Sequence, residues 1–234
     1  MLPSKLKAAP VMELLHSPAI ARSVPFALYI AFLVLAPLVQ KILPGWDSRW
    51  FYAVQIGAVM VALAVFSRSY VELFAGVAVR ARDWALAIGV GIVVFIAWIN
   101  LDLPWATLGK TQGFAPMRGD GTLNWALVAV RIFGAAAVVP IMEELFWRSF
   151  ILRWIDRSDF LRLAPAMVSL RALLISSLLF GVEHDLWFAG LLAGLAYAWL
   201  YVRSGSLWVP VVAHALTNLL LGLWVVQTNH WRFW

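Results

Sequence analysis

The chain contains no cysteine among its 234 residues. Thiol nucleophiles, disulfide bonds and cysteine-ligated metal sites are therefore excluded. Charged residues are also scarce, since Asp, Glu, Lys and Arg make up only 13% of the chain, whereas hydrophobic residues make up 63%. Soluble domains contain about 45 to 50% apolar residues. This composition, with a mean hydropathy of +0.86, predicts an integral membrane protein that crosses the bilayer several times.

The net charge of +6 does not come from a basic cluster. Lys and Arg are scattered between apolar segments, and no aromatic recognition motif accompanies them, so the charge does not indicate a nucleic-acid partner. Cations in this arrangement are typical of residues that flank membrane helices. The expected partner is therefore the lipid bilayer.

Seven apolar segments approach the length of about 20 residues that a helix needs to cross a bilayer. They run from Val24 to Leu43, Trp50 to Phe66, Trp84 to Leu101, Trp125 to Ile151, Val168 to Glu183, Trp187 to Val202 and Leu207 to Val226. An amphipathic stretch at 156–165 leaves room for an eighth, partial helix. The sequence predicts an all-α polytopic membrane bundle of seven or eight transmembrane helices, forming one integral membrane domain over residues 1–234.

The distribution of cations predicts the orientation of this bundle. If the helices alternate in direction, ten cations lie on the side of the N-terminus: Lys5, Lys7, Arg22, Arg68, Arg80, Arg82, Arg153, Arg157, Arg162 and Arg203. Five lie on the other side: Lys41, Arg49, Lys110, Arg118 and Arg232. The positive-inside rule then places the N-terminus in the cytoplasm, with residues 1–23 as a cytoplasmic or interfacial segment. A prokaryotic inner or cell membrane is the expected location.

Two adjacent glutamates, Glu143 and Glu144, interrupt the fourth apolar segment, and Arg148 follows one turn later. An ionisable group at bilayer depth costs roughly 2.5 to 3.5 kcal/mol on insertion scales, so such residues usually face a cavity and serve a function. Residues four apart share a helix face, so Glu144 can pair with Arg148, whereas Glu143 is turned away by about 100°. Glu143 is therefore free to act as a general base on water.

Two further polar pairs lie in later apolar segments. His214 and Asn218 are four residues apart and present two hydrogen-bonding groups on one helix face. Such groups can donate to the oxyanion that forms when an amide is hydrolysed. Phe180 and His184 have the same spacing, which places an aromatic ring beside the imidazole. These groups indicate a hydrolase that activates water within the membrane.

The three motifs are Glu-Glu-x-x-x-Arg at 143–148, Phe-x-x-x-His at 180–184 and His-x-x-x-Asn at 214–218, in this order on successive apolar segments. In this they resemble the CAAX protease and bacteriocin-processing family, which includes the Ras-converting-enzyme type of CAAX endopeptidase and an exosortase-associated branch. The resemblance covers about residues 125–221, the motif-bearing protease core. The first three apolar segments carry no motif.

The resemblance implies an intramembrane glutamate endopeptidase that needs neither a metal nor another cofactor. It also implies a cavity open towards the cytoplasm and the lipid. The implied substrate is a membrane-anchored or prenylated protein or peptide, cleaved near its C-terminus.

The resemblance places six residues in the catalytic site: Glu143, Glu144, Arg148, His184, His214 and Asn218. It assigns water activation to the first glutamate together with the histidine of the second motif. It assigns the oxyanion site to the third motif, and it gives Glu144 and Arg148 the role of orienting and neutralising the centre.

Three alternatives stay open on the residues. Glu143 and two histidines could supply three ligands to a zinc ion with water as the fourth, although no His-Glu-x-x-His motif occurs. The buried acids could form the proton relay of a transporter, although neither inverted repeats nor matched broken helices accompany them. The chain could also be a non-catalytic membrane scaffold or bacteriocin-immunity factor that retains the motifs.

Three charged residues stay outside the predicted site. Arg131 is expected to extend to the membrane interface, with charge pairing as the alternative. Glu183 and Asp185 are expected to be solvated at the interface.

Small residues in the sixth segment predict close helix packing. Gly190, Gly194 and Ala198 recur every four residues, which lets two helix backbones approach each other in lipid. The Gly- and Pro-rich stretch from Asp102 to Asn124 is predicted to be a loop, either a plain connector or a lid.

Overall fold

The computed structural model describes residues 17–74, 76, 78–108 and 113–234. Most of the predicted N-terminal segment 1–23 therefore lies outside the described residues, as do Lys5, Lys7 and Lys110. In the described part the regular structure is helical, apart from one isolated β-bridge between Met117 and Leu123. The predicted all-α class is confirmed.

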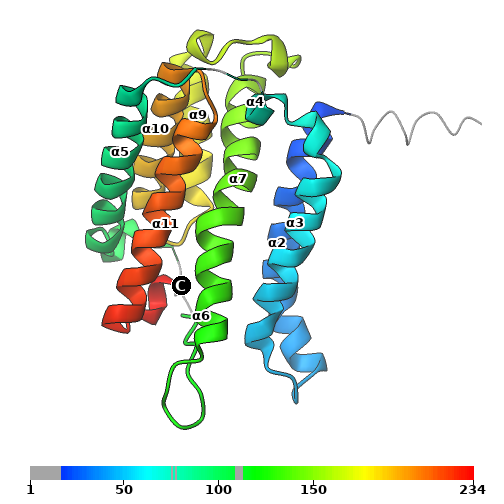
Figure 1. Cartoon of the computed structure of the whole chain (residues 1–234), viewed down its shortest axis with the longest axis vertical. Helices are drawn as coiled ribbons and strands as arrows, with labels where there is room; N and C mark the ends of the chain where they lie inside the picture. Colours follow the sequence, from blue (N-terminus) through cyan, green and yellow to red (C-terminus); the bar gives the residue numbers. More distant parts are fainter. Residues whose placement is uncertain (1–16, 75, 77, 109–112) are drawn as a thin grey trace, which may run out of the picture.

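Helices α2 and α3 form an antiparallel pair at one side of the bundle (Figure 1). Helix α2 spans Pro18–Ile42 and α3 spans Phe51–Val65. The short helix α4, Val71–Phe74, follows at the end of the bundle where α2 begins.

Four helices make up the other side: α5 (Ala81–Asn100), α9 (Leu170–Val182), α10 (Trp187–Ser204) and α11 (Trp208–Thr228). Backbones of α9 and α10 nearly touch. A Cβ added to Gly194 would lie 2.9 Å from the carbonyl oxygen of Ser177, and one added to Gly190 would lie 3.1 Å from the Cα of Gly181. The predicted close packing of the small-residue helix is confirmed, and glycine on both partners permits it.

One long helix, 125–154, passes between these two sides and carries both glutamates (Figure 1). It consists of α6 (Trp125–Phe133), the π-helical segment η4 (Gly134–Val138), α7 (Val139–Glu144), the π-helical segment η5 (Leu145–Ile151) and α8 (Leu152–Trp154). Such π-helical turns are rare and are frequently found at functional sites. The two glutamates thus end a six-residue α-helical stretch that has a π segment on each side.

All seven predicted apolar segments are helices in the structure. Among the described residues, five helical segments have the length and hydropathy of a complete membrane crossing: 18–42, 48–65, 81–100, 125–154 and 208–228. Helix α9 has 13 residues and so rises only about 20 Å, less than the hydrocarbon thickness of about 30 Å. A total of seven or eight crossings remains a prediction.

The stretch 156–165, considered as an eighth partial helix, does not form one. It contains a three-residue 3-10 turn at Phe160–Arg162 and begins a second at Pro165–Met167. Because the side chain of Asp156 accepts hydrogen bonds from the backbone and hydroxyl groups of Ser169, the chain returns directly into α9. A connecting loop therefore replaces the expected helix.

A buried ionic cluster joins α2, α4 and η5 at the end where α2 begins. Glu72 accepts hydrogen bonds from Arg22 at 2.5 Å and from Arg153 at 2.6 Å, and it also pairs with the hydroxyl of Ser149. Burial by itself raises the pKa of Glu72, but the charge of Arg22 and the Ser149 hydroxyl outweigh it and hold the pKa below its usual value. The cluster fixes the α2 and α3 pair against the long central helix.

Candidate active site

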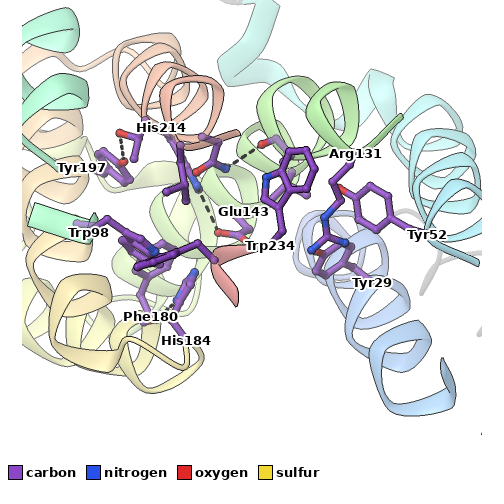
Figure 2. A pocket seen from close by; sticks show the side chains of 17 residues that line it. Tyr29, Tyr52, Trp98, Arg131, Glu143, Phe180, His184, Tyr197, His214 and Trp234 are labelled. Atoms are coloured by element: carbon purple, nitrogen blue, oxygen red, sulfur yellow. Dashed lines mark hydrogen bonds and ion pairs between the residues drawn. The ribbon is translucent and has the colours of Figure 1, made fainter. Parts of the chain in front are cut away.

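A cavity of about 200 Å³ lies between the central helix and the helices on both sides of it, and its lining includes residues of α2, α3, α5, α9, α10 and α11. Four of the six predicted site residues line it: Glu143, His184, His214 and Asn218. The first three are labelled in Figure 2. They come from α7, the end of α9, and α11, so three segments far apart in the sequence converge here. A polar cavity of this size can hold several water molecules.

Glu144 and Arg148 lie behind the cavity wall rather than in the cavity. Both side chains are almost completely buried, with exposed fractions of 0% and 2%, and Nη1 of Arg148 lies 3.1 Å from Oε1 of Glu144. The guanidinium group of Arg148 also stacks on Phe180 at 4.2 Å and lies 3.4 Å from the carbonyl oxygen of Gly194. The predicted pairing of Glu144 with Arg148 is confirmed.

His214 connects this buried pair to the cavity. Its Nδ1 atom lies 3.0 Å from Oε1 of Glu144, and its Nε2 atom lies 3.9 Å from Oε2 of Glu143. An ionised Glu144 can only accept, so Nδ1 carries the proton of that hydrogen bond. Nε2 therefore faces Glu143 and the cavity. The ring of Tyr197 stacks on the imidazole at 5.0 Å and keeps its plane in place.

Glu143 presents an unpaired oxygen to this centre. Its side chain is 6% exposed, and Oε2 makes no hydrogen bond with the residues that the structure describes. A buried carboxylate oxygen without a protein partner is costly unless water or a substrate group binds it. Glu143 is thus placed to hold a water molecule.

The tautomer of His184 follows from its backbone contact. Nδ1 lies 2.7 Å from the carbonyl oxygen of Phe180, and because a carbonyl only accepts, Nδ1 carries the hydrogen. In the neutral ring Nε2 is then a hydrogen-bond acceptor. Phe180 and Trp98 pack around the ring, at 4.7 and 5.3 Å between centroids, and orient it.

Asn218 replaces a backbone hydrogen-bond donor that is missing from the central helix. In η4 the backbone N–H of Val139 bonds to the carbonyl of Gly134, so in the same register the carbonyl of Ala135 would accept from residue 140. Residue 140 is proline, which has no N–H to donate. Asn218 Nδ2 donates to the Ala135 carbonyl instead, at 2.8 Å. One N–H of the amide is thereby anchored, and the second remains available to the cavity.

The cavity continues into a wider chamber of about 1020 Å³. Its lining comes from the end of α5 and the loop after it, the turn 183–186 between α9 and α10, and the C-terminal residues 232–234, together with Tyr29, Ile30 and Leu33 of α2 and Arg131 and Glu143 of the central helix. The loop packs against that turn, since Leu108 donates a backbone hydrogen bond to the carbonyl of Asp185, and Arg232 pairs with Asp102. The stretch predicted as a connector or lid therefore lines the mouth of the chamber.

This mouth lies at the end of the bundle opposite the start of α2 (Figure 1). The orientation predicted from the cations puts the start of α2 on the cytoplasmic side, whereas the family resemblance implied a cavity open towards the cytoplasm. The start of α2 and the mouth lie at opposite ends of the bundle. They cannot both face the cytoplasm, so one of these two predictions must be wrong.

Several residues around the centre did not emerge from the sequence. Glu183, expected at the interface, accepts a hydrogen bond from the Trp147 indole at 2.9 Å and lines the chamber. Arg131, expected to extend to the interface, lines the cavity instead. Tyr197 could have been noticed as a polar side chain among the small residues of α10, and its hydroxyl donates to Thr217 at 2.8 Å.

The donor set does not fit a zinc ion. Among the described residues, no group of three His, Asp or Glu side chains is arranged closely enough to hold a metal. Glu144 is already bonded to Arg148 and His214, so it is not free to serve as a ligand.

Comparisons with known proteins find similarity over the motif-bearing residues. Residues 124–220 match the family model described as "Type II CAAX prenyl endopeptidase Rce1-like". The chain is also similar to "Putative membrane peptidase YdiL" of Bacillus subtilis (strain 168), with 34% identity over 95 residues. That similarity covers 39% of this chain and 35% of the relative, so the chain spans about a third of the curated protein it matches. No solved structure matches the chain.

Proposed function

We propose that the chain is an intramembrane endopeptidase that hydrolyses peptide bonds in a membrane-anchored substrate. The match of residues 124–220 to the Rce1-like family model, which agrees with the resemblance of the three motifs, supports this proposal. The observation that carries this proposal is the convergence of Glu143, His184, His214 and Asn218 on one cavity. The scissile bond would lie near the substrate's C-terminus.

Glu143 and His184 supply two acceptors for one water molecule. Oε2 of Glu143 has no protein partner among the described residues, and Nε2 of His184 is an acceptor because its Nδ1–H is bonded to the Phe180 carbonyl. In the reaction Glu143 takes one proton of the water, and the water oxygen bonds to the carbonyl carbon of the substrate. His184 orients the water by accepting its other hydrogen.

The electrons of the carbonyl double bond move to its oxygen, which becomes an oxyanion. The free N–H of Asn218 donates to this oxygen, and His214 adds a second donor from Nε2 when both of its ring nitrogens carry hydrogen. Nδ1 of His214 lies 3.0 Å from Oε1 of Glu144, which is itself paired with Arg148, so Glu144 and Arg148 act as positioning residues. When the tetrahedral intermediate collapses, the C–N bond breaks and the proton held by Glu143 passes to the leaving amine.

The test is proteolysis by the purified protein in lipid vesicles. The substrates are fluorophore-labelled membrane-anchored peptides, each prepared with and without a prenyl group. The wild type should cleave at least one peptide, and E143Q should reduce the rate by about 10²- to 10⁴-fold, the usual contribution of a general base. The exposed loop substitution D120N is the matched control and should leave the rate unchanged.

Three results would contradict the proposal or its mechanism. Equal cleavage by wild type and E143Q would show that Glu143 is not the base. Proton flux across the vesicle membrane without cleavage of any peptide would favour the transporter alternative. Activity that is lost with a tight chelator and restored by zinc alone would replace the metal-free mechanism with the zinc mechanism.

A further inference from the structure

Arg131 lies in the wall of the cavity without a partner of opposite charge. It comes from α6, and its guanidinium group lies over the ring of Tyr52 at 4.3 Å and near that of Phe114 at 5.1 Å. With the residues that the structure describes it makes no hydrogen bond and no ion pair. A guanidinium group is permanently charged and offers five donors, so an unpaired one at this depth is expected to bind an anion.

Two tyrosine hydroxyl groups accompany it. Tyr29 of α2 and Tyr52 of α3 line the same cavity as Arg131, and within the described part of the chain neither hydroxyl makes a hydrogen bond. Figure 2 shows the Arg131 side chain between these two rings. Tyr52 packs directly against the central helix at Gly134. A Cβ added to Gly134 would lie only 2.5 Å from the hydroxyl oxygen of Tyr52, so the absence of a side chain at Gly134 makes room for the tyrosine. Three helices thus present one cation and two hydroxyl donors to one space.

We propose that Arg131, with Tyr29 and Tyr52, binds a carboxylate of the substrate. The planar fork of a guanidinium group matches a carboxylate in a bidentate arrangement, and hydroxyl groups can donate to its remaining lone pairs. Arg131 and Glu143 are 12 residues apart on the same helix, which corresponds to a rise of about 18 Å. The carboxylate therefore binds several residues along the peptide from the scissile bond.

This inference rests on the proposed function and makes Arg131 a specificity-determining residue of that reaction. A peptide substrate offers two kinds of carboxylate, the free C-terminus and the side chain of Asp or Glu. Both have the same chemistry, so matched peptides must distinguish them.

The experiment uses each cleaved peptide of the panel in four forms. The C-terminus is either free or amidated. In each case the Asp and Glu residues of the peptide are either kept or replaced by Asn and Gln. The form carrying the recognised carboxylate should have a kcat/KM about 10- to 100-fold higher than its amide, the usual effect of losing a hydrogen bond to a charged group. In R131Q the two forms should have about the same kcat/KM, because only cleavage of the carboxylate form is lowered.

A matched control is R118Q, which removes an exposed arginine from the loop at the same end of the bundle and should keep the ratio. Y29F and Y52F should each reduce the ratio by a few-fold. Binding of the peptide pair to E143Q provides a measurement that does not depend on R131Q folding. The inference would be overturned if E143Q bound the carboxylate and amide forms equally, or if R131Q kept the wild-type ratio of kcat/KM. Cleavage of the amide forms would still support the proposed function in either case.

A second, independent observation concerns the charges at the two ends of the bundle. The end opposite the mouth carries nine arginines among the described residues: Arg22, Arg68, Arg80, Arg82, Arg153, Arg157, Arg162, Arg171 and Arg203. Among the same described residues, the end with the mouth carries four cations: Lys41, Arg49, Arg118 and Arg232. Cytoplasmic loops are the ones enriched in Lys and Arg.

We infer that the mouth of the chamber faces away from the cytoplasm, so that substrates reach the site from the outer side of the membrane. The orientation predicted from the cations then holds, and the cytoplasmic opening implied by the family resemblance does not. A peptide exposed on the outer face is the matching substrate.

The absence of cysteine allows a direct test in intact bacterial cells. Gly119 lies in the loop at the mouth end, where an added Cβ meets nothing within 4 Å, and Ser158 is exposed in the loop at the other end. A membrane-impermeant maleimide should label G119C in intact cells and S158C only after the cells are opened. The reverse pattern, or labelling of both sites in intact cells, would overturn the inference. Labelling of both variants in detergent is the control for reactivity.

Discussion

His214 and Glu144 are joined by a contact of 3.0 Å between Nδ1 and Oε1, and the same glutamate oxygen lies 3.1 Å from Arg148. The two glutamates of the first motif therefore have separate surroundings. Glu143 lines the cavity, whereas Glu144 is buried between the imidazole and Arg148. This division follows from the 100° turn between neighbouring helix positions.

Replacement of Glu144 should reduce turnover without weakening substrate binding. E144Q keeps the shape of the side chain but removes the charge that is paired with His214 and Arg148. We expect kcat to fall by about 10²- to 10⁴-fold, comparable with the loss of the orienting acid in a serine protease triad, with little change in KM. Steady-state kinetics on one cleaved peptide would check this. An increase in KM at constant kcat would assign Glu144 to substrate binding instead.

Pro140 should influence activity and stability in opposite directions. P140A supplies a backbone N–H that can bond to the Ala135 carbonyl and so compete with Asn218. We expect a melting temperature at or above that of the wild type, because proline disfavours a helix interior, together with a kcat lower by tenfold or more. P37A, in the exposed part of α2, is the control and should leave kcat unchanged. Unaltered turnover in P140A would show that the anchored amide does not contribute.

The contact between α9 and α10 should make Gly194 intolerant of any side chain. In G194A the new Cβ would lie 2.9 Å from the backbone oxygen of Ser177, which cannot move without displacing α9. We expect a destabilisation of about 1 to 3 kcal/mol. G89A is the matched control, since a Cβ at Gly89 meets nothing within 4 Å. Thermal unfolding in detergent compares the two, and equal melting temperatures would contradict this prediction.

The ionic cluster around Glu72 should make stability depend on pH. The pKa of Glu72 in the folded protein lies below its ordinary value of 4.5, so its contribution is complete above that pH and is lost as the pH falls through the folded pKa. E72Q should cost about 3 to 5 kcal/mol near pH 7, because it leaves buried charge on Arg22 and Arg153. The difference in melting temperature between wild type and E72Q should shrink below about pH 4.5.

A surface control separates this effect from a general loss of charge. D159N removes an exposed ion pair with Arg162 and should change stability by less than about 1 kcal/mol. A difference between wild type and E72Q that stays constant down to pH 3 would exclude Glu72 as the origin of the pH dependence.

The helices could be predicted because each apolar run approaches the thickness of a bilayer, and the motif residues because polar groups are conspicuous in such runs. Other features depend on contacts between distant segments. From the sequence, Glu183 is expected to be an interfacial acid, because its contact of 2.9 Å with the Trp147 indole joins segments that are 36 residues apart. Arg131 reads as a snorkelling cation because its aromatic neighbours come from α3 and from the loop before α6. The side of the membrane on which the mouth opens depends on the whole arrangement of helices.

The π segments could not be predicted either, because a hydrophobic pattern over 30 residues averages over local changes of register. Pro140 was the available signal, since it removes a donor just before the two glutamates. The role of Asn218 as a substitute donor requires the coordinates.

The two wide turns in the central helix have a consequence for how this protein can change over evolutionary time. Each π turn accommodates one residue more than an α-helical turn. Loss of a single residue from 134–138 would allow the helix to close into uninterrupted 3.6-residue register and would rotate Glu143 by about 100° relative to Arg131. Deletions and insertions in this short stretch are therefore more damaging than most exchanges of side chain there, and the number of residues between these two positions is itself a functional constraint.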